Sequence, residues 1–343
     1  NEDHGLVVEQ SEMDVVGGVF EHNGRDGISA HKCKNENSDP RVKISRNAVC
    51  QWNTSQGIRL VGSSAKLSEG VACINNEGNG LLVDFQSVAD VEDCIFKFNK
   101  HSGIYAGQPN TILNARKNNC EKSENDGIVV VNTAADGIID GNTCRANGNS
   151  GILIISGKAE AQVKMKILNN YCIDNKRAYG IWIDGIWNRT EITKNRCEGN
   201  ALGGIAVSKG SRAVLQDNAC TGNLEGILCC DPDSTISLFG KNQCNGNTEN
   251  GLHIRDGGSC TGSGISFATN GKCDIRIGRN SKARCNQIAP QSQRRGNYSQ
   301  PAAMIDGLIH CLTDTSYTPG GEPAPKIIVF QRVGFHSRVR FFL

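Results

Sequence analysis

The sequence is short of long apolar runs, of prolines and of aromatic residues. No stretch of roughly 18 consecutive apolar residues occurs, which excludes a transmembrane helix. The net charge is only +2, and the basic residues show no aromatic interleaving or binding motif, so nucleic acid is not an expected partner. Only 8 prolines and 3 methionines stand against 40 glycines and 35 asparagines, and glycine and asparagine favour turns over long helices. These shortages indicate a turn-rich all-β protein.

A short repeat runs through most of the chain. A Gly-Ile or Gly-Leu pair recurs at intervals of 22 to 30 residues, with its glycine at Gly27, Gly57, Gly80, Gly103, Gly127, Gly151, Gly180, Gly204, Gly226 and Gly251. Cysteine stands six to eight residues before the glycine at Cys50, Cys73, Cys120, Cys144, Cys172, Cys197, Cys220 and Cys244. An asparagine follows the cysteine slot at Asn23, Asn53, Asn76, Asn99, Asn147, Asn175, Asn200, Asn223 and Asn247. A second asparagine precedes the slot at Asn118, Asn142, Asn170, Asn195, Asn218 and Asn242. Ten phased copies of one unit indicate a solenoid.

The length of the unit selects the kind of solenoid. About 23 residues with two or three short apolar runs are too few for a propeller blade and lack helical periodicity. One unit therefore predicts one coil of a parallel β-helix, in which equivalent residues stack about 4.8 Å apart. Parallel crossovers are right-handed, so we expect a single-stranded right-handed helix of about ten to twelve coils. We expect the asparagines to tolerate left-handed backbone and to bond along the stack, and the glycine to permit a tight corner.

The phased Asn, Cys and Gly-Ile positions resemble the right-handed parallel β-helix repeats of the pectate-lyase-like superfamily. The resemblance covers roughly Gly17 to Arg255 and is closest to the Asn/Gly-rich repeats of carbohydrate-binding and sugar-hydrolysing (CASH) domains. The net charge turns positive from Lys272 onward, and five of the 8 prolines lie at or after Pro290, which places a boundary near residues 272–288. We therefore expect a β-helix over residues 1–288 and a non-repeat C-terminal tail over 289–343 that packs on the helix or caps it. Members of this group include polysaccharide lyases, epimerases, glycoside hydrolases and non-enzymatic modules.

The cysteines are expected to form one inner column of buried thiols. Stacked identical rotamers point their sulfurs in parallel, which suits neither a disulfide nor a metal site with convergent ligands. No metal ligands are therefore assigned. The remaining cysteines, among them Cys229, Cys230, Cys260, Cys273 and Cys285, leave room for one or two disulfides.

The Gly-Ile register also predicts which side chains face outward, because residues alternate along a strand. Arg59, Asp84 and Tyr105 fall on three successive coils and form the candidate catalytic set. In this set the arginine would neutralise a uronate carboxylate, the aspartate would bind a cation or act as an acid, and the tyrosine would donate a proton. The candidate substrate-binding residues are His101 in an adjoining turn and a second group made of Trp182, Asp184, Arg189, His253 and Arg255.

These candidates favour recognition of an acidic polysaccharide along one lateral face. The alternative is a non-catalytic scaffold or protein-interaction module, because the acidic cluster of the calcium-dependent lyases is missing. Calcium is the cofactor that the resemblance implies, although no residue set requires one. Whether the chain catalyses a reaction and how many copies assemble stay open. A secreted or periplasmic location is favoured over an intracellular one.

Four outward apolar residues, Val129, Val131, Leu153 and Ile155, need a cover. The apolar stretches 326–330 and 339–343 would supply it if the C-terminal tail packed back along the central coils. A tail that merely caps the last coil is the rival arrangement.

Overall fold

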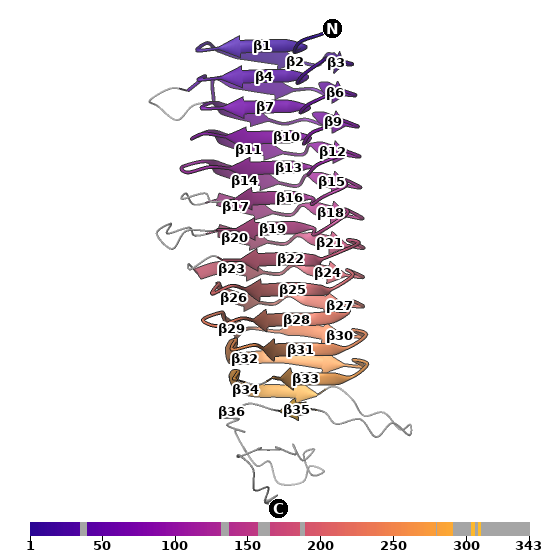
Figure 1. Cartoon of the computed structure of the whole chain (residues 1–343), viewed down its shortest axis with the longest axis vertical. Helices are drawn as coiled ribbons and strands as arrows, with labels where there is room; N and C mark the ends of the chain where they lie inside the picture. Colours follow the sequence, from indigo (N-terminus) through magenta and orange to yellow (C-terminus); the bar gives the residue numbers. More distant parts are fainter. Residues whose placement is uncertain are drawn as a thin grey trace, which may run out of the picture.

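The fold is a parallel β-helix, as the repeat predicts. The computed structural model describes residues 1–34, 40–131, 137–156, 165–185, 189–278, 280–290, 303–305 and 308–309. Strands account for all regular structure in these ranges, and they stack coil on coil from the N-terminus downwards (Figure 1). No helix in the described ranges is long and apolar enough to cross a membrane.

One strand of each coil belongs to a 13-stranded parallel sheet, called sheet A. Its strands are β1 (Leu6–Glu9), β4 (Ile28–His31), β7 (Ile58–Val61), β10 (Leu81–Asp84), β13 (Ile104–Gly107), β16 (Ile128–Val131), β19 (Ile152–Ile155), β22 (Tyr179–Asp184), β25 (Gly203–Ser208), β28 (Glu225–Cys230), β31 (Asn250–Arg255), β33 (Cys273–Ile277) and β35 (Ala303–Ile305). In Figure 1 the strands of this sheet lie one below another, from β1 near the N-terminus to β35.

The other strands form sheet B, which consists of two parallel ladders joined near the C-terminal end. The first ladder holds β2 (Met13–Val16), β5 (Val42–Ser45), β8 (Ser64–Leu67), β11 (Val88–Glu92), β14 (Ile112–Arg116), β17 (Gly137–Asp140), β20 (Met165–Leu168), β23 (Arg189–Thr193), β26 (Arg212–Gln216), β29 (Thr235–Phe239), β34 (Lys282–Pro290) and β36 (Leu308–Ile309). The second holds β3 (Val19–Glu21), β6 (Val49–Gln51), β9 (Ala72–Ile74), β12 (Ile95–Lys97), β15 (Asn119–Glu121), β18 (Thr143–Arg145), β21 (Tyr171–Ile173), β24 (Arg196–Glu198), β27 (Ala219–Thr221) and β30 (Asn242–Asn245). Strand β32 (Ser259–Ala268) joins the two ladders because it pairs with both β29 and β30. Each coil therefore has three faces.

The predicted cysteine column lies in the core. All eight of its thiols are fully buried, and none forms a disulfide. The strand registers place each cysteine against its equivalent in the next coil, as with Cys172 and Cys197, while Phe20, Phe96 and Phe267 occupy the same column. Burial raises the pKa of Cys73 and Cys120 well above its ordinary value. The prediction of buried stacked thiols is therefore confirmed.

No disulfide occurs among the described cysteines outside the column either. The Sγ atoms of Cys260 and Cys285 are 3.4 Å apart, which is an S–H···S contact and not a bond.

The asparagines form two ladders of hydrogen bonds that run along the helix. In the first ladder the Nδ2 of Asn53 donates to the Oδ1 of Asn76 at 2.9 Å, and the backbone N–H of Asn53 donates to the same oxygen. In the second, Asn195 Nδ2 donates to Asn218 Oδ1 at 3.0 Å and to the Ile167 carbonyl oxygen at 2.8 Å. These amides satisfy backbone groups at the corners, where the sheet ladders stop.

The expectation that the ladder asparagines adopt left-handed backbone is wrong. The left-handed residue is the one immediately before each asparagine of the first ladder, such as Trp52 with φ 56° and Phe98 with φ 56°. The corner bends at that residue, so the asparagine that follows it points inward and bonds along the stack.

The recurring glycine is required because the next coil packs closely against it, and not because its backbone is left-handed. None of the ten glycines has a positive φ. A Cβ at Gly151 would lie 2.7 Å from the Gly180 carbonyl oxygen and 2.9 Å from Cys172 Cβ. Both the glycine and the following isoleucine face the core, so the tight corner brings this backbone against the cysteine column.

Beyond the predicted boundary at residue 288, two short strands continue both sheets. Strand β35 pairs in parallel with β33, and β36 pairs with β34. The apolar segments 326–330 and 339–343, expected to cover the central coils, lie outside the described residues, so the packing of the tail stays a prediction.

Candidate functional site

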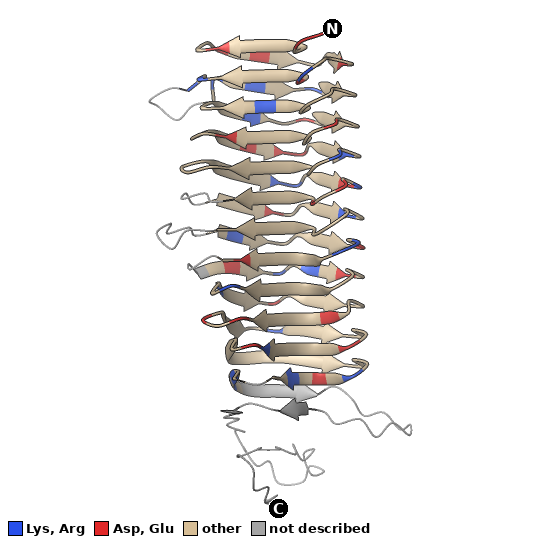
Figure 2. Cartoon of the chain, in the orientation of Figure 1, with Lys and Arg blue, Asp and Glu red and all other residues tan. Residues whose placement is uncertain are grey.

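The outer face of sheet A carries almost all the residues singled out from the sequence. The register aligns one outward column along Arg59, Leu82, Tyr105, Val129, Leu153, Trp182, Ala206, Leu228 and His253. Figure 2 shows that β13, β16 and β19, in the middle of this face, carry no charged residue. The polar residues therefore form two separate groups, one on each side of an apolar centre.

The first group consists of Arg59, Asp84 and Tyr105 on adjacent strands β7, β10 and β13. The ring of Tyr105 leans across Gly107, since a Cβ there would lie 2.7 Å from Tyr105 Cε1 and 3.2 Å from its hydroxyl oxygen. This places the hydroxyl over the second outward column, to which Asp84 also belongs.

The charges of this group influence one another. Burial raises the pKa of Asp84, while the positive charge of Arg59 opposes that rise. Burial and the nearby Asp84 carboxyl both raise the pKa of Tyr105. The Nε of Arg59 is buried and has no hydrogen-bond partner. The Arg59 side chain as a whole is partly exposed, so its terminal Nη groups are the donors that an anionic ligand would meet. His101 is exposed in the turn between β12 and β13 and not on a sheet A strand.

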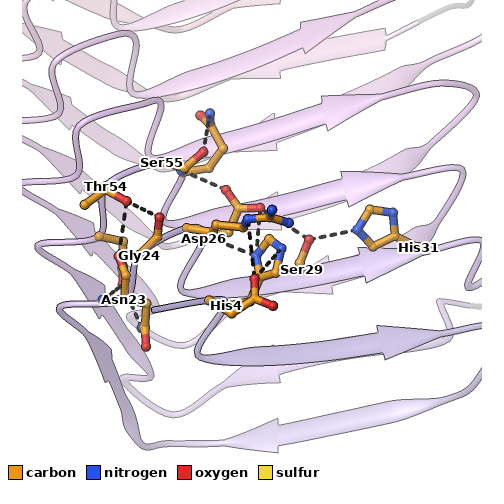
Figure 3. A network of polar contacts seen from close by, with 12 residues as sticks. His4, Asn23, Gly24, Asp26, Ser29, His31, Thr54 and Ser55 are labelled. Atoms are coloured by element: carbon orange, nitrogen blue, oxygen red, sulfur yellow. Dashed lines mark hydrogen bonds and ion pairs between the residues drawn. The ribbon is translucent and has the colours of Figure 1, made fainter. Parts of the chain in front are cut away.

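A hydrogen-bonded network borders this group on its N-terminal side (Figure 3). The hydroxyl of Ser29 lies 2.9 Å from His31 Nε2 and 3.3 Å from Asp26 Oδ2, and His4 Nδ1 lies 3.2 Å from the same Asp26 oxygen. Burial and the charge of Arg59 lower the pKa of His31. Ser29 is fully buried, so its hydroxyl orients His31 and does not reach a ligand.

The second group lies over β22, β25, β28 and β31. Tyr179 and Trp182 meet edge to face, with ring centroids 5.4 Å apart and planes inclined by 60°. Both rings pack against a small apolar cluster that includes Ala206 and Leu228. The Trp182 Nε1–H donates to Ser208 Oγ at 2.9 Å, so the indole is fixed in place.

Asp184 is held tightly beside these rings. Its Oδ1 accepts from the Ser208 hydroxyl at 2.7 Å, and its Oδ2 accepts from Lys209 Nζ at 2.7 Å. The carboxylate therefore holds strand β25 and the following turn against β22.

Sequence reasoning missed a buried carboxylate next to these residues. Glu225, at the start of β28, accepts from Asn250 Nδ2 at 3.0 Å and lies 3.1 Å from His253 Nδ1. Its position, just before Gly226, breaks the strict in-out alternation, because the glycine and the next isoleucine both face inward. The same break brings Tyr179 outward just before Gly180.

The two predicted arginines of this group lie apart from its centre. Arg255 is exposed, and its Nη1 donates to Asp256 at 2.8 Å. Arg189 begins β23 in sheet B, and its side chain lies outside the described residues.

The carboxylates of this face do not fit a calcium site of the lyase kind. Calcium takes six to eight oxygen ligands, whereas Asp84 has no acidic neighbour on its face and both oxygens of Asp184 and of Glu225 are already bonded. In the described ranges no cluster of three or more His, Cys, Asp or Glu side chains suits a metal ion.

Comparison with known proteins agrees with this architecture. The family model described as "Right handed beta helix region" matches residues 34–185 and 163–288, well over half of the chain. No match was found among curated proteins. The catalytic domain of a GH87 alpha-1,3-glucanase in complex with nigerose is 12% identical, with a TM-score of 0.43, over 89% of this chain and 63% of that one. The chain thus spans less than two thirds of the glucanase domain.

The Siphovirus 9NA tailspike receptor binding domain is 10% identical, with a TM-score of 0.30, over 94% of this chain and 74% of that one. At such identities these likenesses concern the fold alone. The family model spans the central repeats, and the chain belongs to the right-handed β-helix family.

Proposed function

We propose that the chain binds an acidic polysaccharide along the outer face of sheet A. The observation that carries this proposal is the fixed aromatic pair of Tyr179 and Trp182 beside hydrogen-bonding polar groups. Sugar rings present an apolar C–H face and a rim of hydroxyls, which such a surface matches. Trp182 is only partly buried, so part of its ring meets solvent.

The acidic character of the ligand rests on the first group. Arg59 is a partly exposed cation on this face, and charge-assisted pairs between guanidinium and carboxylate are among the strong hydrogen bonds in proteins. A uronate carboxylate would supply the acceptor. Asp84 and Tyr105 adjoin this position, and their catalytic role stays a prediction that Asp84→Asn and Tyr105→Phe would measure.

The spacing of the two groups suits a polymer and not a single sugar. Strands β7 and β22 are five coils apart, which corresponds to roughly 24 Å at about 4.8 Å per coil. Between them Val129 is 4% exposed and Leu153 is 9% exposed, so these two side chains offer little surface, and the contacts to a ligand would come from the two groups. A chain of several sugars laid along the helix axis would reach both groups.

The test is a binding titration with polygalacturonate and alginate as uronate polymers and dextran as the neutral polymer. Trp182→Ala should weaken uronate-polymer binding about tenfold, which corresponds to roughly 1.4 kcal/mol. Trp52→Ala is the matched control, because Trp52 is 50% exposed in the corner between β6 and β7 and belongs to no strand of sheet A. Equal effects of the two variants would contradict the proposed face.

Substitution of Arg59 tests whether the bound polymer is acidic or neutral. Arg59→Gln should weaken binding of uronate polymers by about 10- to 100-fold, since hydrogen bonds to charged groups contribute roughly 1.5–3 kcal/mol. Arg46→Gln, at an exposed arginine beside β5 in sheet B, is the control.

A protein-interaction scaffold is the second candidate. It is favoured by the internal bonds of Asp184 and Glu225, because each oxygen of both carboxylates already accepts from a neighbouring side chain. Absence of binding to all three polymers would favour this candidate.

A further inference from the structure

Two cysteines outside the column meet in the last long strands of sheet B. Cys260 lies in β32 and Cys285 lies in β34, and their Sγ atoms are 3.4 Å apart. Both side chains belong to the hydrophobic core, and Cys260 is 1% exposed whereas Cys285 is 4% exposed. The two sulfurs are therefore in direct contact inside the protein.

The strand register explains why these two sulfurs face one another. In the cysteine column each thiol stands opposite the thiol of the next coil, so the sulfurs point in parallel. The other two cysteines are offset along their strands, because Cys260 stands opposite Ala283 and Gly262 stands opposite Cys285. The glycine has no side chain and the alanine has only a methyl group, so the two thiols share the space that these small residues leave.

The coil before this pair fills the same two positions with larger apolar side chains. Leu238 of β29 stands opposite Gly262, and in the same strand Ile236 stands opposite Cys260. Both of these apolar side chains are buried. A glycine and a thiol fill less space than a leucine and an isoleucine, so packing of the core does not by itself account for the exchange.

The contact makes the two thiols chemically unequal. A hydrogen bond from the Cys260 thiol stabilises the thiolate of Cys285 and lowers the pKa of Cys285. The same hydrogen bond, together with burial, raises the pKa of Cys260 well above its ordinary value. Cys285 is also the more exposed of the two, so its sulfur is the nucleophile that a small reagent would meet first.

We propose that peroxide oxidation joins Cys260 and Cys285 in a disulfide that clamps the last coils of the β-helix. This modification site lies in sheet B, so the inference is independent of polysaccharide binding on the outer face of sheet A. The clamp acts where a solenoid is weakest, because each coil is supported by its neighbours and the terminal coils have fewer of them.

Hydrogen peroxide is the oxidant, and the reaction balances in two steps. The Cys285 thiolate attacks one peroxide oxygen, the O–O bond breaks, and the released hydroxide takes up a proton to become water, which leaves a sulfenic acid on the cysteine. The Cys260 sulfur then attacks the sulfenic sulfur, the S–S bond forms, and the S–O bond breaks to release hydroxide, which leaves with the Cys260 proton as water. In total, two thiols lose two electrons to one peroxide and give one disulfide and two waters.

The experiment maps this disulfide in the full chain after treatment with hydrogen peroxide. Trypsin releases Cys260 in peptide 256–272 and Cys285 in peptide 285–294, and each of these peptides contains one cysteine. Mass spectrometry without reductant should find the two peptides joined, and dithiothreitol should separate them. Oxidation in concentrated urea, where all 16 cysteines compete, should lower the yield of the joined peptide about tenfold.

The clamp itself is measured by amide hydrogen exchange of the oxidised and the reduced protein. In the oxidised protein, exchange in β32 and β34 should slow by about tenfold or more, because a disulfide restricts the opened state of the strands that it joins. Exchange in β7, at the other end of the solenoid, should stay unchanged and serves as the internal control.

Two variants complete the test. Cys285→Ser should abolish both the joined peptide and the slower exchange. Cys273→Ser is the matched control, because Cys273 is a buried cysteine of the neighbouring strand β33, and it should retain both effects. If Cys285→Ser does not fold, the peptide map and the hydrogen exchange of the wild type decide without it.

Three results would overturn the proposal. One is a folded, peroxide-treated wild type whose two peptides stay separate. Another is the joining of Cys260 to Cys229 in place of Cys285. The third is a joined peptide with unchanged exchange in β32 and β34, which would contradict the clamp.

Discussion

At the residue scale, each coil depends on a few positions at which the same residue type recurs in the coils before and after it. The first asparagine ladder has one gap among the described residues, where Ser123 stands in place of the expected asparagine. The backbone N–H of Ser123 still donates to Asn147 Oδ1 at 3.1 Å, but its hydroxyl is buried without a partner. The backbone therefore already has the ladder geometry, and only the side chain is missing.

Ser123→Asn should complete the ladder and stabilise the protein. The new amide would bond to Asn147 and offer its oxygen to Asn99, with a gain of about 1 kcal/mol in the free energy of unfolding. Urea denaturation measures the change. Ser11→Asn, at an exposed bend, is the control and should change stability by less than about 0.5 kcal/mol. A loss of stability in Ser123→Asn would show that the corner does not accept the larger side chain.

Glycines in this fold have two different roles, which a pair of substitutions separates. Gly151→Ala forces a Cβ to within 2.7 Å of the next coil's backbone and should cost about 3 kcal/mol or more. Gly222 has φ +67° but open space around its Cβ position, so Gly222→Ala should cost only about 1–2 kcal/mol. Equal losses in thermal or urea unfolding would contradict the packing argument.

At the element scale, the sequence predicted the order of the outward columns correctly because a strand alternates with a fixed period. Arg59, Leu82 and Tyr105 are indeed in register. The alternation fails only where the chain turns into sheet A, and there Glu225 could not be found by counting. No local signal marks it, since its partners Asn250 and His253 come from the following coil.

The strands β22 and β25 are connected by a chain of hydrogen bonds that Ser208 completes. Ser208→Ala leaves the indole N–H of Trp182 and one oxygen of Asp184 unpaired, at a cost of roughly 1–3 kcal/mol. Polysaccharide affinity should fall together with stability, because the Trp182 indole loses the hydrogen bond that orients it. Ser237→Ala, on the outer side of β29, serves as the control in both measurements. An unchanged unfolding free energy would show that water replaces the hydroxyl.

At the scale of the whole molecule, the repeat determined the fold almost completely, because every coil buries the same residue types against the coil before it. The chain end could not be treated in this way, since the repeat stops near residue 255 and the tail has no period. The function was predicted only in outline, because the chemistry depends on contacts between coils that are unrelated in local sequence.

The buried thiols make the whole molecule sensitive to alkali. Burial raises the pKa of Cys94 and of Cys229 to about 12, and that of Cys230 to about 11. In the unfolded chain a thiol titrates near 8.5, so folding favours the protonated form. This stabilisation is complete below about pH 8.5 and is lost as the pH rises towards 12, by about 1.4 kcal/mol per pH unit for each thiol.

Urea unfolding between pH 7 and pH 10.5 checks this expectation, and Cys94→Ala should show a shallower alkaline decline than the wild type. A free energy of unfolding that stays constant up to pH 10.5 would contradict it.

The asparagine ladders also have a direction. Every described Nδ2–Oδ1 bond of the first ladder points from one coil to the next, from Asn23 towards Asn270. The small amide dipoles therefore add head to tail, as peptide dipoles do in a helix. At the last of them, Asn270 Nδ2 donates to the carboxyl of Asp274 at 2.8 Å, so an acidic group closes the positive end. The solenoid thus has two electrically unlike ends, and a grafted coil would extend it only when joined head to tail.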